Sequence, residues 1–132
     1  WFERCHIHSK KNSYVTAAST VEDHEFGYIF NRCRLTAADG IERVYLGRPW
    51  RPFAATLFIR CELGNHILPE GWHNWDNPAN EKSARYAEYG NTGPGANPGT
   101  RVAWSRQLSR REAKRYTVEN VFDRHDGWSP VR

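Results

Sequence analysis

Apolar and polar residues alternate along several short stretches of this chain, as they do on strands with one buried face. The clearest stretch spans residues 57–63, where every second residue is apolar: Leu57, Ile59, Cys61 and Leu63. This period of two is typical of a β-strand and differs from the 3.6-residue period of a helix. Similar patterns predict strands over residues 1–8, 14–18, 26–35, 43–46 and 56–63.

A seven-residue block occurs three times along the chain, beginning at Trp1, Ile29 and Leu57. Each copy carries Phe, Arg and Cys at the same offsets, and Ile or Leu follows two places after each Cys. A fixed period of this length indicates one structural unit stacked on itself. Because the block is rich in aromatic and β-branched residues, we expect a solenoid of parallel strands in which like residues stack.

The three cysteines, Cys5, Cys33 and Cys61, are equally spaced. An odd number argues against a disulfide framework, and equal spacing predicts a buried column of free, structural thiols. Strict alternation would also place Glu3 and Asn31 on the cysteine side of their strands. We therefore expect a bulge or short turn between the Phe and the Cys of each block, at a position that the sequence does not fix.

The repeats are expected to occupy residues 1–100, with a long excursion over 64–82. Residues 90–99 are rich in Gly and Pro, predict no regular structure and end the repeat region. Residues 101–132 are expected to form a C-terminal cap, which a solenoid needs to cover its last open edge. Within it, residues 109–112 match a capping box and predict a short helix over 113–122.

Composition limits the class of protein without identifying it. The chain has 132 residues, enough for one domain or part of one. No apolar run approaches about 18 residues, so no transmembrane helix is predicted. The sequence has no signal peptide, and it starts inside a repeat copy without Met, which indicates a piece of something longer. The net charge of +4 is compatible with nucleic acid, an acidic polysaccharide or neither.

The segment 44–50 is the densest candidate for chemistry. A strand runs into Gly47, and Arg48 is then held between Gly47 and Pro49, with Trp50 next to it. Pro49 biases Arg48 toward an extended backbone, so its guanidinium is a fixed fork suited to a carboxylate. Trp50 offers a flat apolar face for a sugar ring. The alternative is a strand end with an arginine packed on a tryptophan, and the spacing alone leaves both open.

The run Tyr45-Leu46-Gly47-Arg48-Pro49-Trp50 resembles the signature of pectin methylesterases, the carbohydrate esterases that demethylate pectin. Further segments resemble the bacterial form of that family in the same order: residues 15–18, 71–75, 88–89, 93–96, 116–117 and 128–130. This resemblance implies an all-β fold, a right-handed single-stranded parallel β-helix of the pectin-lyase type, here partial. It agrees with the solenoid that the repeat predicts.

The resemblance also implies a chemistry. In that family one aspartate attacks the methyl ester, a second acts as general acid and then base, a glutamine stabilises the oxyanion, and an arginine orients the nucleophile. By resemblance Arg48 is the catalytic arginine, and Trp50 and Trp72 flank the cleft and stack on galacturonate rings. The family implies no metal or organic cofactor, pectin or homogalacturonan as partner, no nucleic acid or membrane partner, a monomer when full length, and a secreted or periplasmic location.

The sequence departs from that pattern in one respect. The family's aspartates and glutamine lie upstream of the segment that matches Trp1, and only Asp23 and Asp39 precede Arg48 here, both in turn-like contexts. We therefore expect this chain to be inactive by itself. The first alternative is a non-catalytic β-helix module that binds polysaccharide through Trp50 and Trp72. A basic nucleic-acid-binding domain is the second.

Weaker signals have simpler interpretations. His6 and His8 share one strand face, but no third metal ligand is suggested, so solvated histidines are expected. His66 and His73 belong to the long loop and could border the cleft. The basic residues of 101–115 predict a solvated helix face or a surface that attracts pectin. No Gly-x-Ser-x-Gly elbow supports a serine esterase.

Overall fold

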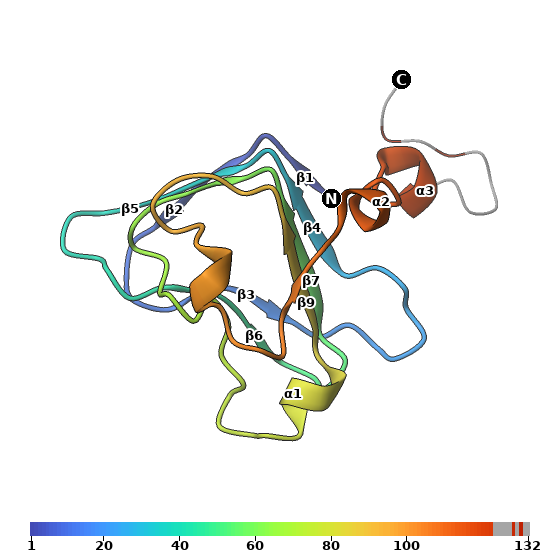
Figure 1. The fold of residues 1–132 in the computed structure, drawn as a ribbon, viewed down its shortest axis with the longest axis horizontal. Helices are drawn as coiled ribbons and strands as arrows, with labels where there is room; N and C mark the ends of the chain where they lie inside the picture. Colours follow the sequence, from blue (N-terminus) through green and yellow to red (C-terminus); the bar gives the residue numbers. More distant parts are fainter. Residues whose placement is uncertain (123–127, 129, 131–132) are drawn as a thin grey trace.

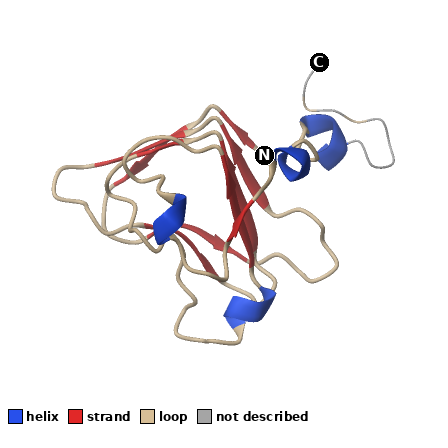
Figure 2. Ribbon diagram, viewed as in Figure 1, coloured by secondary structure: helices blue, strands red, loops and turns tan. Residues whose placement is uncertain are grey.

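The computed structural model describes residues 1–122, 128 and 130, so the last part of the predicted cap lies outside the described residues. Figure 1 looks along a coiled stack of strands in which successive turns of the chain overlie one another. The described strands form three parallel sheets, with the orders β1-β4-β7-β9-β10, β2-β5-β8 and β3-β6. The predicted parallel β-helix is confirmed, and Figure 2 shows its strands on separate sides of a triangular section.

The sheets are built from short strands. Their bounds are β1 (Phe2–Glu3), β2 (His6–Ser9), β3 (Tyr14–Ala18), β4 (Tyr28–Asn31), β5 (Arg34–Ala37), β6 (Tyr45–Pro49), β7 (Ala55–Ile59), β8 (Glu62–Leu63), β9 (Arg85–Tyr89) and β10 (Arg106–Gln107). The helices are α1 (Asn80–Ser83), the 3-10 turn η1 (Pro98–Thr100), α2 (Arg110–Ala113) and α3 (Val118–Phe122). No helix among the described residues has the length and apolar character needed to cross a membrane.

The strand register confirms the repeat. Phe2 pairs with Phe30 and Phe30 with Phe58, and successive rings stack with centroids 4.5 Å apart. The three cysteines are free, as expected. Cys33 and Cys61 are buried, and each thiol donates to the carbonyl of the phenylalanine one turn earlier, at 3.4 Å. Burial raises the pKa of Cys33 and raises that of Cys61 to about 12, so these thiols are protonated core groups.

The turn expected between Phe and Cys is present, and the structure locates it at the arginine of each block. Arg4, Arg32 and Arg60 have φ of 51°, 55° and 50°, in the left-handed region that non-glycine residues seldom adopt. This one residue reverses the side-chain parity. Phe58 and Cys61 therefore share the interior. The single face predicted for 57–63 is thus wrong, because Leu57 and Ile59 belong to a separate cluster outside that core.

A fourth turn of the solenoid, β9, lies where the sequence predicts no strand. Glu88 pairs with Phe58 and so occupies a phenylalanine position, and Gly90 takes the left-handed corner with φ of 61°. Regular structure also reaches into 90–99, because η1 begins at Pro98.

The C-terminal segment adds a strand to the last edge of the solenoid and also packs on a sheet face. Strand β10 pairs with β9, and the residues after it lie on the outer face of β7. Leu108 and Tyr116 contact Leu57 and Ile59, which are apolar and point outward from β7. The predicted capping box is confirmed: the Ser109 side chain accepts from the Glu112 amide, and Glu112 accepts from the Ser109 amide. The predicted continuous helix is wrong, since α2 ends at Ala113 and α3 begins at Val118.

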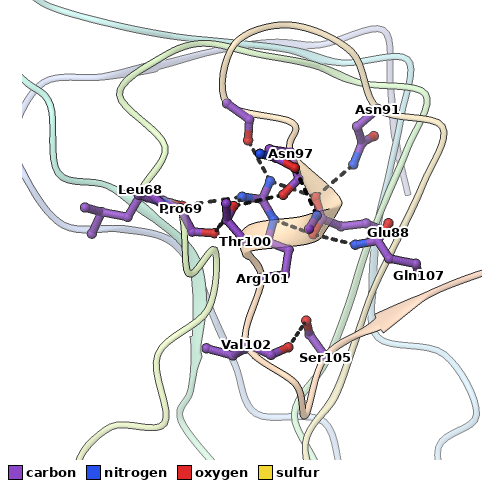
Figure 3. Close-up of polar contacts among 12 residues, drawn as sticks. Leu68, Pro69, Glu88, Asn91, Asn97, Thr100, Arg101, Val102, Ser105 and Gln107 are labelled. Atoms are coloured by element: carbon purple, nitrogen blue, oxygen red, sulfur yellow. Dashed lines mark hydrogen bonds and ion pairs between the residues drawn. The ribbon is translucent and has the colours of Figure 1, made fainter.

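A buried ion pair joins β9 to the segments around it (Figure 3). Arg101 Nε lies 2.8 Å from Glu88 Oε2, and the two side chains are 3% and 4% exposed. Arg101 also donates to the carbonyls of Gly95 and Pro69, and Glu88 accepts from Asn91 and Gln107. Arg101 is therefore no part of the solvated helix face that the basic stretch predicts.

Candidate functional site

Strand β6 fixes the backbone of Arg48. Arg48 pairs with Ala17 of β3, and the neighbouring Gly47 pairs with Thr16 on one side and bridges to Trp72 on the other. A Cβ on Gly47 would lie 2.3 Å from Thr16 Oγ1 and 3.1 Å from the Trp72 ring, so only glycine fits between these two neighbours. The strand continues through Pro49, two residues beyond the Gly47 end that the sequence suggests.

The half-buried guanidinium of Arg48 is surrounded by aromatic rings. Its Cζ lies 3.8 Å from the ring centroid of Trp75, 5.2 Å from that of Trp50 and 5.4 Å from that of Tyr14. These distances are within the range of cation–π attraction, so three rings from three segments hold the cation in place.

A second layer of rings supports the first. Tyr14 and Tyr45 stack with centroids 5.4 Å apart, and the His73 ring lies 5.8 Å and 5.0 Å from them. Burial, followed by the charge of Glu70, raises the pKa of Tyr45, so its hydroxyl stays protonated. His73 borders the site, as the sequence suggests.

The turn that carries Trp75 has a left-handed backbone at two non-glycine residues, Trp75 and Asp76, with φ of 58° and 53°. Side chains of the same loop stabilise it. His73 Nδ1 accepts from the Trp75 amide at 3.1 Å, and Asn74 Oδ1 accepts from the Asp76 amide at 2.8 Å. Left-handed non-glycine residues are costly and gather at functional sites, so this turn is a candidate for function.

Arg48 has no carboxylate partner in the part of the chain that the structure describes. Elsewhere in that part, arginine–carboxylate pairs join Arg101 to Glu88, Arg106 to Glu112 and Arg115 to Glu25. Asp23 and Asp39 are exposed in turns, and neither forms an ion pair with Arg48. The fork is therefore available to an acid that these residues do not supply.

The family model for pectinesterases matches residues 2–125. This chain belongs to the pectinesterase family. It is 40% identical over 122 residues to pectinesterase 31 of Arabidopsis thaliana, a match that covers 92% of this chain and 38% of that relative. It thus spans about two fifths of that relative's length.

Solved pectin methylesterases share the fold. The carrot enzyme superposes with a TM-score of 0.84 and 28% identity, covering 92% of this chain and 43% of that one. A pectin methylesterase variant solved in complex with a hexasaccharide gives a TM-score of 0.80 at 24% identity, covering 99% and 46%, and shows the fold alone.

The two predicted tryptophans lie in different environments. Trp50 is 64% exposed beside Arg48, which leaves its face open to a ligand. Trp72 is 1% exposed and stacks on Tyr86 in the core at 4.3 Å. Burial therefore gives Trp72 a packing role in place of the predicted stacking on a sugar. Trp75, which is 49% exposed, lies where such a ring could bind.

Three more histidines that the sequence singles out, His6, His8 and His66, are hydrogen-bonded or buried. His6 Nε2 and His8 Nδ1 are both hydrogen-bonded to Thr36 Oγ1, at 2.7 Å and 2.8 Å. Within the described residues, no three His, Cys, Asp or Glu side chains are grouped as metal ligands. His66 is buried, and burial lowers its pKa.

Proposed function

We propose that this chain forms the arginine-bearing part of a pectinesterase, which hydrolyses galacturonate methyl esters of pectin to free carboxylates and methanol. The observation that carries the proposal is the half-buried fork of Arg48, held by Tyr14, Trp50 and Trp75 and without a carboxylate among the described residues. Family membership supports the same reaction class.

In this proposal Arg48 positions a nucleophilic aspartate supplied by sequence outside these 132 residues. A bidentate guanidinium favours the charged form of a carboxylate and so keeps its pKa low. It also fixes the direction of attack on the ester carbonyl. The attack forms an acyl-enzyme and breaks the bond to the methoxy group, which leaves as methanol with a proton from the second aspartate. Water then hydrolyses the acyl-enzyme. Without the two catalytic aspartates of the family, this chain alone binds substrate and leaves the ester intact.

The open tryptophan faces would hold the polymer. Trp50 and Trp75 flank Arg48 from two segments, so sugar rings stacked on them would run past the guanidinium. A related pectin methylesterase fold holds a hexasaccharide, which supports an oligomeric substrate. Because pectin is a cell-wall polymer, the whole protein would act outside the cytoplasm, in the periplasm or the medium. It would act as a monomer.

The test is methanol release from methyl-esterified pectin by the full-length protein of which this chain is a part. Arg48→Lys keeps the charge but removes the fork, and we expect activity to fall about 100-fold. Arg51→Lys, an exposed neighbour, is the matched control and should retain activity. Wild-type activity in the Arg48 variant would remove this arginine from the mechanism.

A non-catalytic role in polysaccharide binding remains the second candidate, because the exposed rings of Trp50 and Trp75 need no nucleophile to bind sugar. The two functions separate in one measurement on the full-length protein. Saturable binding of pectin oligosaccharides with no methanol release favours the binding module, and turnover favours the esterase.

A further inference from the structure

The left-handed arginines form a column at one corner of the solenoid, between the sheets of β1-β4-β7 and β2-β5-β8. Arg4, Arg32 and Arg60 are all exposed there, one turn apart, and neighbouring strands in a sheet are about 4.8 Å apart. In the fourth turn Gly90 takes the same corner with the same backbone. Glycine is the residue that this conformation favours, so the backbone itself does not require arginine. The presence of arginine at all three corners therefore needs an explanation other than backbone conformation.

A groove of about 640 Å³ lies beside this column. Arg4, Arg60 and Asn31 line it from the corner, Trp1 and Phe122 supply apolar surface, and α3 forms its other side. This volume is within the range of small-molecule sites. Strand β6, which carries Arg48, lies across the section from this corner (Figure 1), so the groove is separate from the candidate active site.

The polar groups of the groove favour a sugar acid. Arg60 stacks on Tyr89 at 5.4 Å, which orients its fork, and Arg4 lies 3.9 Å from Glu3. The Glu3 carboxylate already accepts from the Trp1 indole and the Asn31 amide, both at 2.9 Å. By contrast, Asn31 Oδ1 is buried and accepts no hydrogen bond from the described residues. A buried acceptor without a donor is costly, and a ligand hydroxyl would satisfy it.

We infer that this corner groove binds an acidic saccharide, with Arg4 and Arg60 holding a uronate carboxylate and Asn31 Oδ1 accepting from a ring hydroxyl. The choice of uronate rests on the proposed function, because ester hydrolysis of pectin releases such carboxylates. Glu3 and Glu119 also line the groove, so the two arginines are balanced by two acids. That balance favours a ligand rich in hydroxyls and argues against a densely charged phosphate polymer.

The test measures binding to the full-length protein by calorimetry, with unesterified oligogalacturonate, its fully methylated form and duplex DNA as probes. Every protein carries Trp50→Ala and Trp75→Ala, which remove both exposed rings of the cleft. With Arg4→Gln and Arg60→Gln added, we expect affinity for the unesterified oligomer to fall tenfold or more. Adding Lys11→Gln and Arg43→Gln, which makes the same charge change at exposed sites outside the groove, should alter affinity less than twofold. Circular dichroism checks that each variant is folded.

Three results would overturn the inference. These are wild-type affinity in the Arg4/Arg60 variant, equal binding of the methylated oligomer, and tighter binding of DNA. Methanol release by protein that keeps Trp50 and Trp75 reports the proposed function separately. If turnover persists while the corner variant binds normally, the inference fails and the proposed function stands.

Discussion

Two arginines of this chain occupy contrasting environments. Arg101 is buried and fully partnered: it pairs with Glu88 at 2.8 Å, and its remaining donors reach backbone carbonyls. Arg48 is only half-buried. Its surroundings are aromatic rings, and no carboxylate among the described residues completes them.

The contrast separates a structural arginine from a functional candidate by a physical criterion. Moving a guanidinium out of water is costly, and paired groups must repay that cost. At Arg101 the chain itself supplies these partners, so this arginine ties neighbouring segments of the fold together. At Arg48 the rings orient the cation and leave its donors for something else. The buried pair should therefore matter for stability, and the half-buried cation for binding and chemistry.

The sharpest way to break this comparison is to remove one partner at each site. Arg101→Gln leaves the buried Glu88 carboxylate without its cation, and we expect the free energy of unfolding to fall by about 3–5 kcal/mol. Arg48→Gln should cost less than about 1 kcal/mol, because only cation–π contacts are lost. Urea unfolding followed by circular dichroism measures both. Equal losses in the two variants would remove the distinction.

A second test compares tryptophans from the same two regions. Trp72→Phe opens space against Tyr86 in the core, and we expect a loss of about 1–3 kcal/mol. Trp75→Phe changes an exposed ring and should cost less than about 1 kcal/mol. Oligosaccharide affinity should respond in the opposite way, falling for Trp75→Phe and holding for Trp72→Phe. A loss of affinity confined to Trp72→Phe would restore the role that the sequence predicts for Trp72.

The sequence reveals the solenoid because its repeat is local and exact in spacing. The Phe and Cys columns can be predicted from residue type and register alone. The left-handed corner could not be assigned to a residue, since arginine carries no preference for that backbone, and glycine appears there only in the fourth turn.

The sequence does not predict the fourth turn, for a related reason. Its inward position holds Glu88 in place of Phe. A buried carboxylate is tolerated there because it forms an ion pair with Arg101, 13 residues further along the chain, which the local pattern around Glu88 does not reveal. Nor does sequence reveal which tryptophan of the 71–75 segment is buried. That depends on the left-handed backbone of Trp75 and Asp76, which turns Trp75 outward while Trp72 bridges to Gly47.

The smallest expected effect is a pH dependence of stability that comes from the buried thiol of Cys61. Burial raises the pKa of Cys61 from 9.0 to about 12, so between these values the unfolded chain loses this proton and the folded chain keeps it. Stability is therefore full below pH 9 and falls as the pH rises toward 12. Between pH 8 and pH 10 this thiol should lower the free energy of unfolding by about 1 kcal/mol.

Cys61→Ala is the matched variant, because it removes the titrating group and keeps a small apolar side chain. Its stability should change less between pH 8 and pH 10 than that of the wild type, as measured by urea unfolding at each pH. An identical pH dependence would mean that Cys61 reaches solvent in the folded chain. The interior would then be open to water, and the contrast between a closed core around Arg101 and an open face around Arg48 would lose its physical basis.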